Sequence, residues 1–352
     1  MQLRTELIKK VFHFGFDART SRGRMKDKTS WFIKLRHEDN PNVFGLGESG
    51  PLPGLSVDDR PDFEEVLSQC VERVPTLQSL NDIEKIVPPG FPSIRFGFET
   101  AWLDLHHGGV RKIYDTPFVT GAPIPINGLV WMGDLDTMLQ QVSIKIAQGF
   151  RCIKIKVGGL NFEKECDILQ YIRSKYFREG ITIRLDANGA FKPEEAIYKL
   201  TTLARYNIHS IEQPVKPGLG MMEDLCEKSP IPIALDEELI GVETKADKIK
   251  LLDRIKPQFI ILKPTLHGGL VSCAEWIALA EERSIGWWIT SALESNIGLN
   301  AICQFTANYE TALPQGLGTG QIYEDNFPSP LTVSDGTICY DQKKIWDLQE
   351  LG

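Results

Sequence analysis

The sequence predicts an α/β protein in which a (β/α) barrel follows a smaller α+β domain. From about residue 124 onward, short β-branched runs alternate with amphipathic stretches, as expected of repeated βα units and a parallel sheet. The runs occupy residues 124–130, 152–157, 181–187, 209–214, 231–237, 258–264 and 286–292, with a possible eighth at 312–318. This number approaches that of a (β/α)₈ barrel, and an open doubly wound sheet is the alternative.

The stretches between these runs carry helix signals. Residues 136–148 form one amphipathic stretch, which Gly149 closes. Residues 193–206 form another, which Pro193 opens with Glu194 and Glu195 in its first turn. Each predicted unit therefore has a start and a stop.

The N-terminal part has a different pattern. Residues 7–16 and 31–37 alternate in polarity like paired antiparallel strands, and helical segments are expected at 63–74 and 99–107. We therefore expect an α+β domain over residues 1–115 and a barrel over 116–317. The tail, 318–352, is rich in turn residues with one weak strand, and we expect it to pack back on the N-terminal domain.

Composition limits the classes of partner. The 352 residues are 42% hydrophobic and 24% charged, with a net charge of -8, which argues against nucleic acid and favours a small-molecule substrate. Seven cysteines without a C-x-x-C pair suggest a reducing cytoplasm. We expect no signal peptide and no membrane segment. The sequence leaves the oligomeric state open.

Five charged residues recur at the ends of successive strand runs. They are Lys156, Asp186, Glu212, Asp236 and Lys263, separated by 30, 26, 24 and 27 residues. In a barrel, such positions converge on the face that carries the active site. Any one of them alone is better explained as a solvated strand end, but five in register indicate a site.

Three of these residues are acids, without His or Cys beside them. Asp186, Glu212 and Asp236 would form an all-oxygen site that suits Mg²⁺, or Mn²⁺, better than zinc. Converging acids repel each other, and a divalent cation is the simplest partner that keeps them ionised. We therefore predict that these three residues are metal ligands, with positions left for a substrate carboxylate.

The stretch "CIKIKVGG" places Lys154 and Lys156 on the same face of one strand. Burial beside another ammonium group and a metal can lower the pKa of a lysine toward about 7 to 8, where it can act as a base. We expect Lys154 to lower the proton affinity of Lys156 in this way, with Lys263 facing it from a strand across the ring.

These residues resemble the muconate-lactonizing subgroup of the enolase superfamily. The likeness rests on the K-x-K pair and on "LDANG", "IEQP", "ALDE" and "ILKP", and it covers nearly the whole chain. Within the subgroup the sequence is most similar to the o-succinylbenzoate synthase family of menaquinone biosynthesis. "GLGESGPLPGLS", "PSIRFGFETAWLDL", "PINGLVWMG", "SALESNIGL" and "GLGTG" carry that likeness.

The resemblance implies a modified TIM barrel whose mouth is covered by the N-terminal domain and the tail. It implies a Mg²⁺-dependent syn dehydration through an enediolate, a lyase reaction that yields 2-succinylbenzoate. Lys156 would be the acid–base residue and Lys263 a stabilising cation.

The resemblance also implies which residues support or contact the substrate. Arg184 and Asn188 would support the site, and the loop from Ser291 through Glu294 to Ser295 would approach the succinyl carboxylate together with Gly318, Thr319 and Gly320. A basic loop at residues 17–30 would act as a lid, with Arg19, Thr20 and Ser21 as candidate substrate contacts, although a solvated hairpin explains its charge equally well.

Two alternatives stay open at this point. An N-succinylamino acid racemase or a dipeptide epimerase of the same superfamily would use Lys156 and Lys263 as paired bases, and "SALES" disfavours the epimerase because that family has an Asp-x-Asp sequence there. A non-catalytic metal-binding or ligand-binding barrel would need the acids but not the lysine on the opposite wall.

Overall fold

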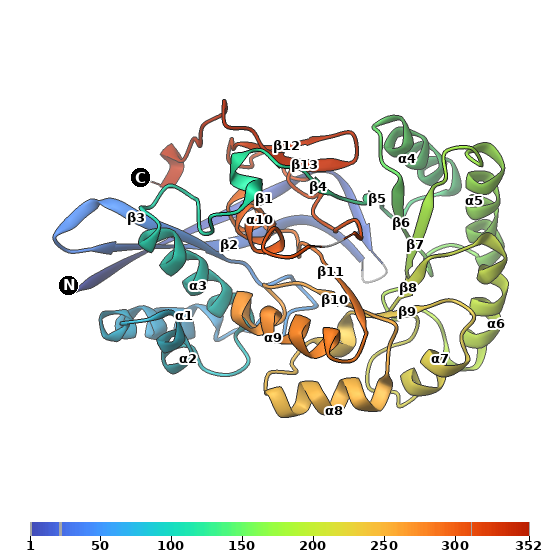
Figure 1. The fold of residues 1–352 in the computed structure, drawn as a ribbon, viewed down its shortest axis with the longest axis horizontal. Helices are drawn as coiled ribbons and strands as arrows, with labels where there is room; N and C mark the ends of the chain where they lie inside the picture. The colour runs from blue at the N-terminus through green and yellow to red at the C-terminus, as the bar shows by residue number, and fades with distance from the viewer. Residues whose placement is uncertain (1, 21–22, 311, 352) are drawn as a thin grey trace.

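The computed structural model describes residues 2–20, 23–310 and 312–351, and these residues form three β-sheets with surrounding helices (Figure 1). The fold is a curled sheet of parallel strands with an antiparallel domain packed against one end, as predicted. Among the described residues, no helix has the length and apolar character to cross a membrane.

The N-terminal domain is a three-stranded antiparallel sheet backed by helices. Its strands are β1 (Leu3–Thr20), β2 (Gly23–His37) and β3 (Asn40–Ser49), and its helices are α1 (Phe63–Arg73), α2 (Ile83–Ile86) and α3 (Pro92–His106). Strand β3 was not among the predicted strands. It packs so closely on α3 that a Cβ atom at Gly47 would lie 1.9 Å from the Gly97 carbonyl oxygen. The glycines that permit this packing also weaken the strand pattern in the sequence.

Seven parallel strands follow one another in chain order through the second sheet. They are β5 (Gly128–Val130), β6 (Cys152–Lys156), β7 (Thr182–Asp186), β8 (Ser210–Glu212), β9 (Ile233–Leu235), β10 (Phe259–Leu262) and β11 (Gly286–Ile289). A doubly wound sheet reverses its strand order at a switch point. The order here does not reverse, which excludes that alternative.

Helices pack along the outer side of this curled sheet (Figure 1). They are α4 (Leu135–Ala147), α5 (Phe162–Lys175), α6 (Pro193–Leu203), α7 (Met222–Lys228), α8 (Lys245–Ile255) and α9 (Gly269–Glu281). The buried helix α10 (Asn296–Thr306) packs against β3 and α3 of the N-terminal domain. Asp134 accepts a hydrogen bond from the Thr137 backbone at the start of α4, and Pro193 opens α6.

The eighth position of the barrel contains bridges rather than a full strand. Gln315 pairs with Ile126, and Gly316 pairs with Thr290, so the predicted run at 312–318 joins the first strand region to β11. The Asn127 amide donates to the Gln315 carbonyl at 2.9 Å, and the Ser291 amide donates to the Gly316 carbonyl at 3.0 Å. Backbone hydrogen bonds therefore close the ring at the height of the site.

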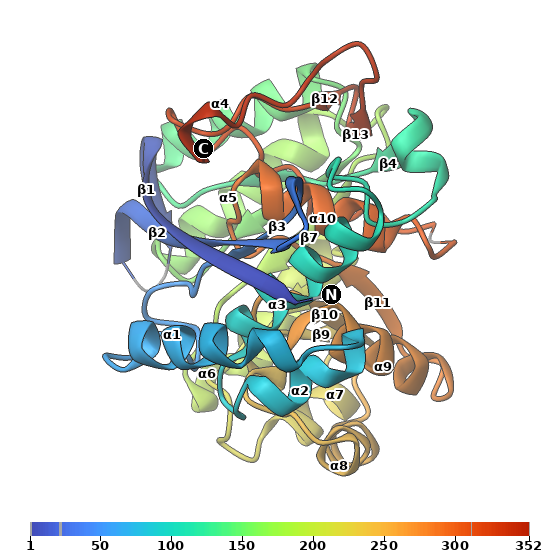
Figure 2. The same cartoon turned by 90° about the vertical axis from the view of Figure 1, so that its left-hand side faces the viewer.

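The tail forms two strands where one was expected. These are β12 (Leu331–Ser334) and β13 (Thr337–Tyr340), and β13 also pairs with the short β4 (Ile124–Pro125). The tail then runs beside the N-terminal sheet (Figure 2). There the Gly15 amide donates to the Ile322 carbonyl at 2.9 Å, and Lys34 donates to the Leu351 carbonyl at 3.1 Å.

Strand alternation separates an apolar outer face from a mixed inner face. Ile153 and Ile155 belong to the large core under the helices, whereas Ala234, Ile261 and Trp288 form a separate small cluster. Lys154 and Lys156 have the opposite parity to the two isoleucines and so point into the ring. This explains how two lysines can occupy a fully buried strand.

Candidate active site

The predicted charged residues meet at the carboxyl ends of adjacent strands. Lys156, Asp186 and Glu212 are the last residues of β6, β7 and β8, while Asp236 and Lys263 directly follow β9 and β10. All five are buried. Parallel pairing aligns Lys156 with Asp186 and Asp186 with Glu212, which fixes their common height.

Amines and acids form one network at this height. Lys154 Nζ lies 2.9 Å from Asp186 Oδ2 and also donates to Glu212. Lys263 Nζ donates to Asp236 and lies 3.5 Å from Glu212 Oε1. Each of these two lysines therefore bridges a pair of acids from neighbouring strands.

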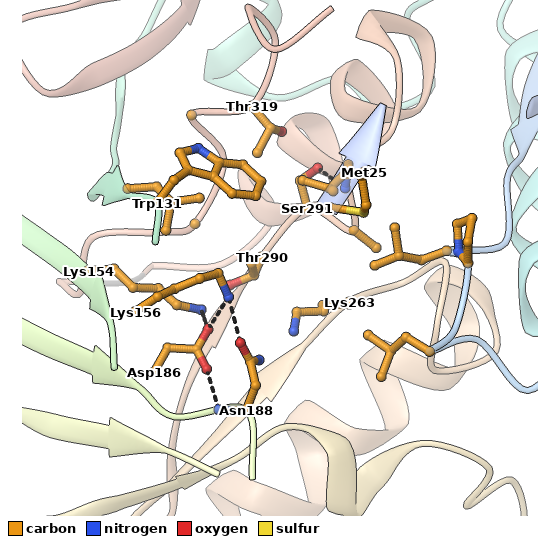
Figure 3. A pocket seen from close by; sticks show the side chains of 18 of the residues that line it. Met25, Trp131, Lys154, Lys156, Asp186, Asn188, Lys263, Thr290, Ser291 and Thr319 are labelled. Atoms are coloured by element: carbon orange, nitrogen blue, oxygen red, sulfur yellow. Dashed lines mark hydrogen bonds and ion pairs between the residues drawn. The ribbon is translucent and has the colours of Figure 1, made fainter. Parts of the chain in front are cut away.

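Lys156 has a different environment from Lys154. Its Nζ donates to Asp186 Oδ2 at 2.9 Å and to Asn188 Oδ1 at 2.8 Å, and it faces the open cavity (Figure 3). Asn188 adopts a left-handed φ of 44° and donates its side-chain amide to Glu237 Oε1 at 3.0 Å. The predicted supporting residue Asn188 thus contacts the predicted acid–base residue directly.

The two bridging lysines are held in their charged form. Burial alone would lower the pKa of Lys154, but the attraction of Asp186 and Glu212 outweighs it and the pKa is raised. Burial would also lower the pKa of Lys263, but the attraction of Asp236 and Glu212 outweighs this effect, and the pKa of Lys263 is raised. The direction at Lys154 and Lys263 is therefore opposite to the downward tuning expected of a buried lysine base, because the acids lie so close.

The acids respond in opposite directions. Burial would raise the pKa of Asp186, but Lys154, Lys156 and Lys263 together hold it well below its usual range. For Glu212, burial and the negative charge of Asp186 raise the pKa to about 7. Asp186 differs from Glu212 because three ammonium groups surround it.

The three acids fit a divalent cation by the chemistry of their donors. All carry hard oxygen donors, and Asp236 Oδ1 is buried without a hydrogen-bond partner among the described residues. As the side chains stand, Lys154 and Lys263 lie between the carboxylates. Accordingly, in the described parts of the chain no three Asp, Glu, His or Cys side chains are spaced to hold one ion.

Sequence reasoning missed Gln213, which links two of the acids. This fully buried residue has a left-handed φ of 39° and directly follows Glu212. Its Oε1 accepts from the backbone amides of Asp236 at 3.3 Å and Glu238 at 3.2 Å, and its Nε2 donates to the Val215 carbonyl at 3.0 Å. The "IEQP" sequence marked the position, but only the backbone conformation shows what its side chain reaches.

A cavity of about 250 Å³ lies above this network (Figure 3). Predicted residues on its wall are Lys154, Lys156, Asp186, Asn188, Lys263, Ser291, Gly318 and Thr319. Glu212 and Asp236 lie behind the lysines and are not on the wall. The cavity thus presents amines and amide groups to a ligand, with two of the three acids behind them.

An apolar wall faces the amines, and the sequence did not predict it. Its residues are Met25, Leu52, Leu55, Leu129, Trp131, Ala292 and Leu293. They come from the N-terminal domain, from β5 and the residue after it, and from the loop after β11. Trp131 directly follows a predicted strand end and could have been found from that position, whereas Leu52 and Leu55 lie in a loop rich in Pro and Gly.

Some residues that were predicted to support the site or to approach the substrate do not line the cavity. Arg184 is buried one layer deeper, where Nη1 donates to the Pro314 carbonyl at 2.7 Å and the guanidinium lies 4.0 Å from the Trp288 ring centroid. Glu294 and Ser295 are buried behind the Ser291 loop and do not line the cavity, and neither does Gly320.

Of the three predicted lid contacts, the described residues include the side chain of Arg19 alone. Arg19 lines a neighbouring cavity and forms an ion pair with Asp17 at 2.5 Å. The side chain of Thr20, and Ser21 as a whole, lie outside the described residues. The described residues of the predicted loop, 17–30, lie in β1 and β2 rather than in a loop, because the two strands extend past the predicted ends, and Gly23, Arg24 and Met25 at the start of β2 line the main cavity.

Comparison with known proteins gives consistent matches. Residues 137–343 match the family described as "Enolase C-terminal domain-like". The o-succinylbenzoate synthase of Desulfotalea psychrophila is 42% identical over 351 residues, covering 91% of this chain and 94% of that protein. The crystal structure of MenC from Desulfotalea psychrophila has a TM-score of 0.86 at 38% identity, covering 96% of this chain and 100% of that one. The L-Ala-D/L-Glu epimerase of Bacillus subtilis is 26% identical over 245 residues, 67% of this chain and 62% of that protein.

The chain is an enzyme of the enolase superfamily. This follows from the capped barrel, from its ring of acids and lysines, and from the family match over residues 137–343. Enzymes of this superfamily use a divalent metal. Within the superfamily, the chain belongs to the o-succinylbenzoate synthase family. The resemblance read from the sequence is thereby confirmed.

Proposed function

We propose that this protein is an o-succinylbenzoate synthase of menaquinone biosynthesis. It would dehydrate 2-succinyl-6-hydroxy-2,4-cyclohexadiene-1-carboxylate to 2-succinylbenzoate. The observation that carries the proposal is the placement of Lys156 and Lys263 on the wall of one cavity, beside three strand-end acids, in a chain 42% identical to a synthase.

Lys156 moves the proton in this reaction. Its neutral Nζ removes the hydrogen on the carbon that bears the carboxylate, and the resulting ammonium then protonates the hydroxyl on the adjacent carbon. The C–H and C–O bonds break, a ring C=C bond forms, and water leaves from the same face. Asp186 and Asn188 orient Nζ through hydrogen bonds of 2.9 and 2.8 Å.

Lys263 acts as the opposing cation. It projects into the cavity from the strand end after β10, across from Lys156 on β6 (Figure 3). Its raised pKa keeps it charged, since Asp236 and Glu212 outweigh the effect of burial. An ammonium group in a buried site stabilises negative charge that develops on the substrate carboxylate.

The proposed metal is Mg²⁺, held by Asp186, Glu212 and Asp236. When bound, the ion would stabilise the charge of the enediolate by electrostatic attraction. For these acids to reach one ion, Lys154 and Lys263 must withdraw from between them, and Asp236 Oδ1 is already without a competing partner in the described structure.

The purified protein with Mg²⁺ tests this function on two substrates. We expect conversion of the cyclohexadiene carboxylate to 2-succinylbenzoate, followed by its ultraviolet absorbance, with a kcat/KM well above that for racemisation of an N-succinylamino acid. A kcat/KM higher for racemisation than for dehydration would contradict the assignment. The racemase stays the second candidate because lysines on two sides of the cavity also suit proton transfer to opposite faces.

A further inference from the structure

Outside the catalytic network, a second group of buried charges lies between the N-terminal domain and the barrel. It consists of Lys28 on β2, Glu48 on β3 and Glu294 after β11. Lys28 is 1% exposed, Glu48 1% and Glu294 0%. Charges are rarely buried to this extent unless a specific arrangement requires them.

The N-terminal domain holds a barrel helix through Glu48. Its carboxylate accepts from the Ser295 amide at 3.0 Å, the Ser295 hydroxyl at 2.6 Å and the Gly298 amide at 3.0 Å. These donors form the first turn of α10. On its other side, Glu48 accepts from Ser30 at 2.7 Å, and Lys28 Nζ lies 3.9 Å from it.

Glu294 holds the loop that precedes α10. It accepts from the Ser291 hydroxyl at 2.5 Å and from Thr265. Leu293, the residue before it, has a left-handed φ of 65°, and its carbonyl accepts from Tyr323 at 2.6 Å. A Cβ atom at Gly298 would lie 2.8 Å from Glu48 Oε2 and 2.8 Å from Glu294 Cβ, so the two acids pack against the same point of α10.

Each member of the group is close in sequence to a segment of the cavity wall. Lys28 follows the wall residues Gly23, Arg24 and Met25, Glu48 precedes Leu52 and Leu55, and Glu294 follows the wall segment 291–293. The three segments are far apart along the chain. Contacts among these three buried charges therefore hold the three wall segments at defined distances from one another.

We propose that Lys28, Glu48 and Glu294 form a positioning network that fixes the distance between the N-terminal domain and the 291–293 turn across the cavity. It thereby sets the affinity for the succinyl-bearing ligand rather than the rate of proton transfer. Lys28 lies too deep to bind the ligand itself and acts through the segments it holds. This inference rests on the proposed function for the identity of the ligand.

The packing around Lys28 leaves little freedom for another arrangement. A Cβ atom at Gly50 would lie 2.4 Å from Lys28 Nζ and 2.6 Å from the Ser30 hydroxyl. The ammonium group therefore fills a space that the backbone at Gly50 leaves open. Removal of the Lys28 charge deletes the ammonium group 3.9 Å from Glu48, which weakens the attachment of Glu48 to β2, while the hydrogen bond from Ser295 still attaches Glu48 to α10.

The test compares Lys28→Met with Lys248→Met. Lys248 is also 1% exposed and forms an ion pair with Glu275 at 2.8 Å, but it lies on α8 outside the cavity. For Lys28→Met we expect the Kd of 2-succinylbenzoate, measured by calorimetry with Mg²⁺, and the KM to rise about 10-fold, while kcat changes less than about 3-fold. Lys248→Met should lower the melting temperature without changing Kd.

A double variant separates positioning from stability. Lys28→Met with Glu48→Gln removes both charges, so it should regain folding stability lost in the single variant yet keep the raised Kd. An unchanged Kd in both Lys28 variants, an equal rise of Kd in Lys248→Met, or a loss confined to kcat would overturn the proposal. If the wild-type protein neither forms nor binds 2-succinylbenzoate, the proposed function fails instead, which the wild-type titration shows separately.

Discussion

Lys154 and Lys156 project from the same face of β6, yet their side chains contact different groups. Lys154 lies between Asp186 and Glu212, and it neutralises acids. Lys156 contacts Asp186 and Asn188 and faces the ligand cavity. Two residues of strand, about 7 Å, therefore separate a lysine held between two acids from the lysine for which we propose proton transfer.

Gln213 is the residue whose removal should affect metal binding most selectively. Gln213→Leu deletes the acceptor that holds the Asp236 and Glu238 amides, so the two acids on β8 and β9 lose their fixed spacing. We expect the Kd for Mn²⁺, measured by electron paramagnetic resonance, to rise about 10- to 100-fold. Gln170→Leu on the exposed face of α5 is the matched control. Equal Mn²⁺ affinity in the wild type and Gln213→Leu would refute this role.

At the scale of elements, the buried side chain of Glu99 links α3 of the N-terminal domain to α9 of the barrel by hydrogen bonds. Glu99 on α3 accepts from the Leu270 amide at 2.5 Å and from the Val271 amide at 3.2 Å, both in the first turn of α9. Burial raises the pKa of Glu99 to about 7, against the lowering effect of these hydrogen bonds. The carboxyl group therefore binds its proton more tightly in the folded state than in the unfolded chain.

This shift predicts a pH dependence of stability. Because the folded pKa is raised above its value of 4.5, the contribution of Glu99 is fully present below about pH 4.5 and is lost as the pH rises through about 7. Glu99→Gln should flatten that part of the profile, by at most about 3 kcal/mol. Urea unfolding of both proteins at several values between pH 5 and 8 measures the difference. Parallel profiles would mean that Glu99 does not carry the shift.

At the scale of the whole molecule, one aromatic core joins the N-terminal domain, the barrel and the tail. Phe12 and Phe32 come from the sheet, Leu293 and Ile297 from the barrel, and Phe327 from the tail. The Phe327 ring lies 5.7 Å from Phe12 and 5.3 Å from Phe32, edge to face. A shared core of this kind favours unfolding of all three parts together.

Phe327→Ala tests that coupling. Loss of a buried aromatic ring should lower the free energy of unfolding by about 3–5 kcal/mol, with one transition retained in calorimetry. Phe177→Ala, at a side chain that is 69% exposed, should change little. Two separate transitions in the wild-type protein would show that the parts unfold independently.

The sequence predicts the barrel and its charged ring well, because both follow from patterns within single βα units. Polar residues recur at strand ends once per βα unit, and the structure brings Asp186, Glu212 and Asp236 to adjacent strands as that spacing requires. Arg184 was expected near the site from the family resemblance. It lies two residues deeper on β7 than Asp186, so the alternation that points it inward also places it below the cavity.

Features that depend on contacts between distant segments could not be predicted. Lys28 lies between Asp27 and Thr29, and Glu48 lies between Gly47 and Ser49, so the neighbouring residues do not indicate burial. Docking of the sheet on α10 buries both side chains. The role of Gln213 depends on a left-handed backbone that nothing in its neighbours requires. The apolar wall at Leu52 and Leu55 belongs to a loop without a periodic pattern.

The steady-state rate of dehydration by Lys156→Ala tests the central claim most directly. With Mg²⁺ and the cyclohexadiene carboxylate, we expect kcat/KM to fall at least about 10³-fold while the melting temperature and the Kd of 2-succinylbenzoate stay near wild-type values. Lys199→Ala on α6, outside the cavity, should retain full activity. A Lys156→Ala protein that forms 2-succinylbenzoate at the wild-type rate would contradict the account.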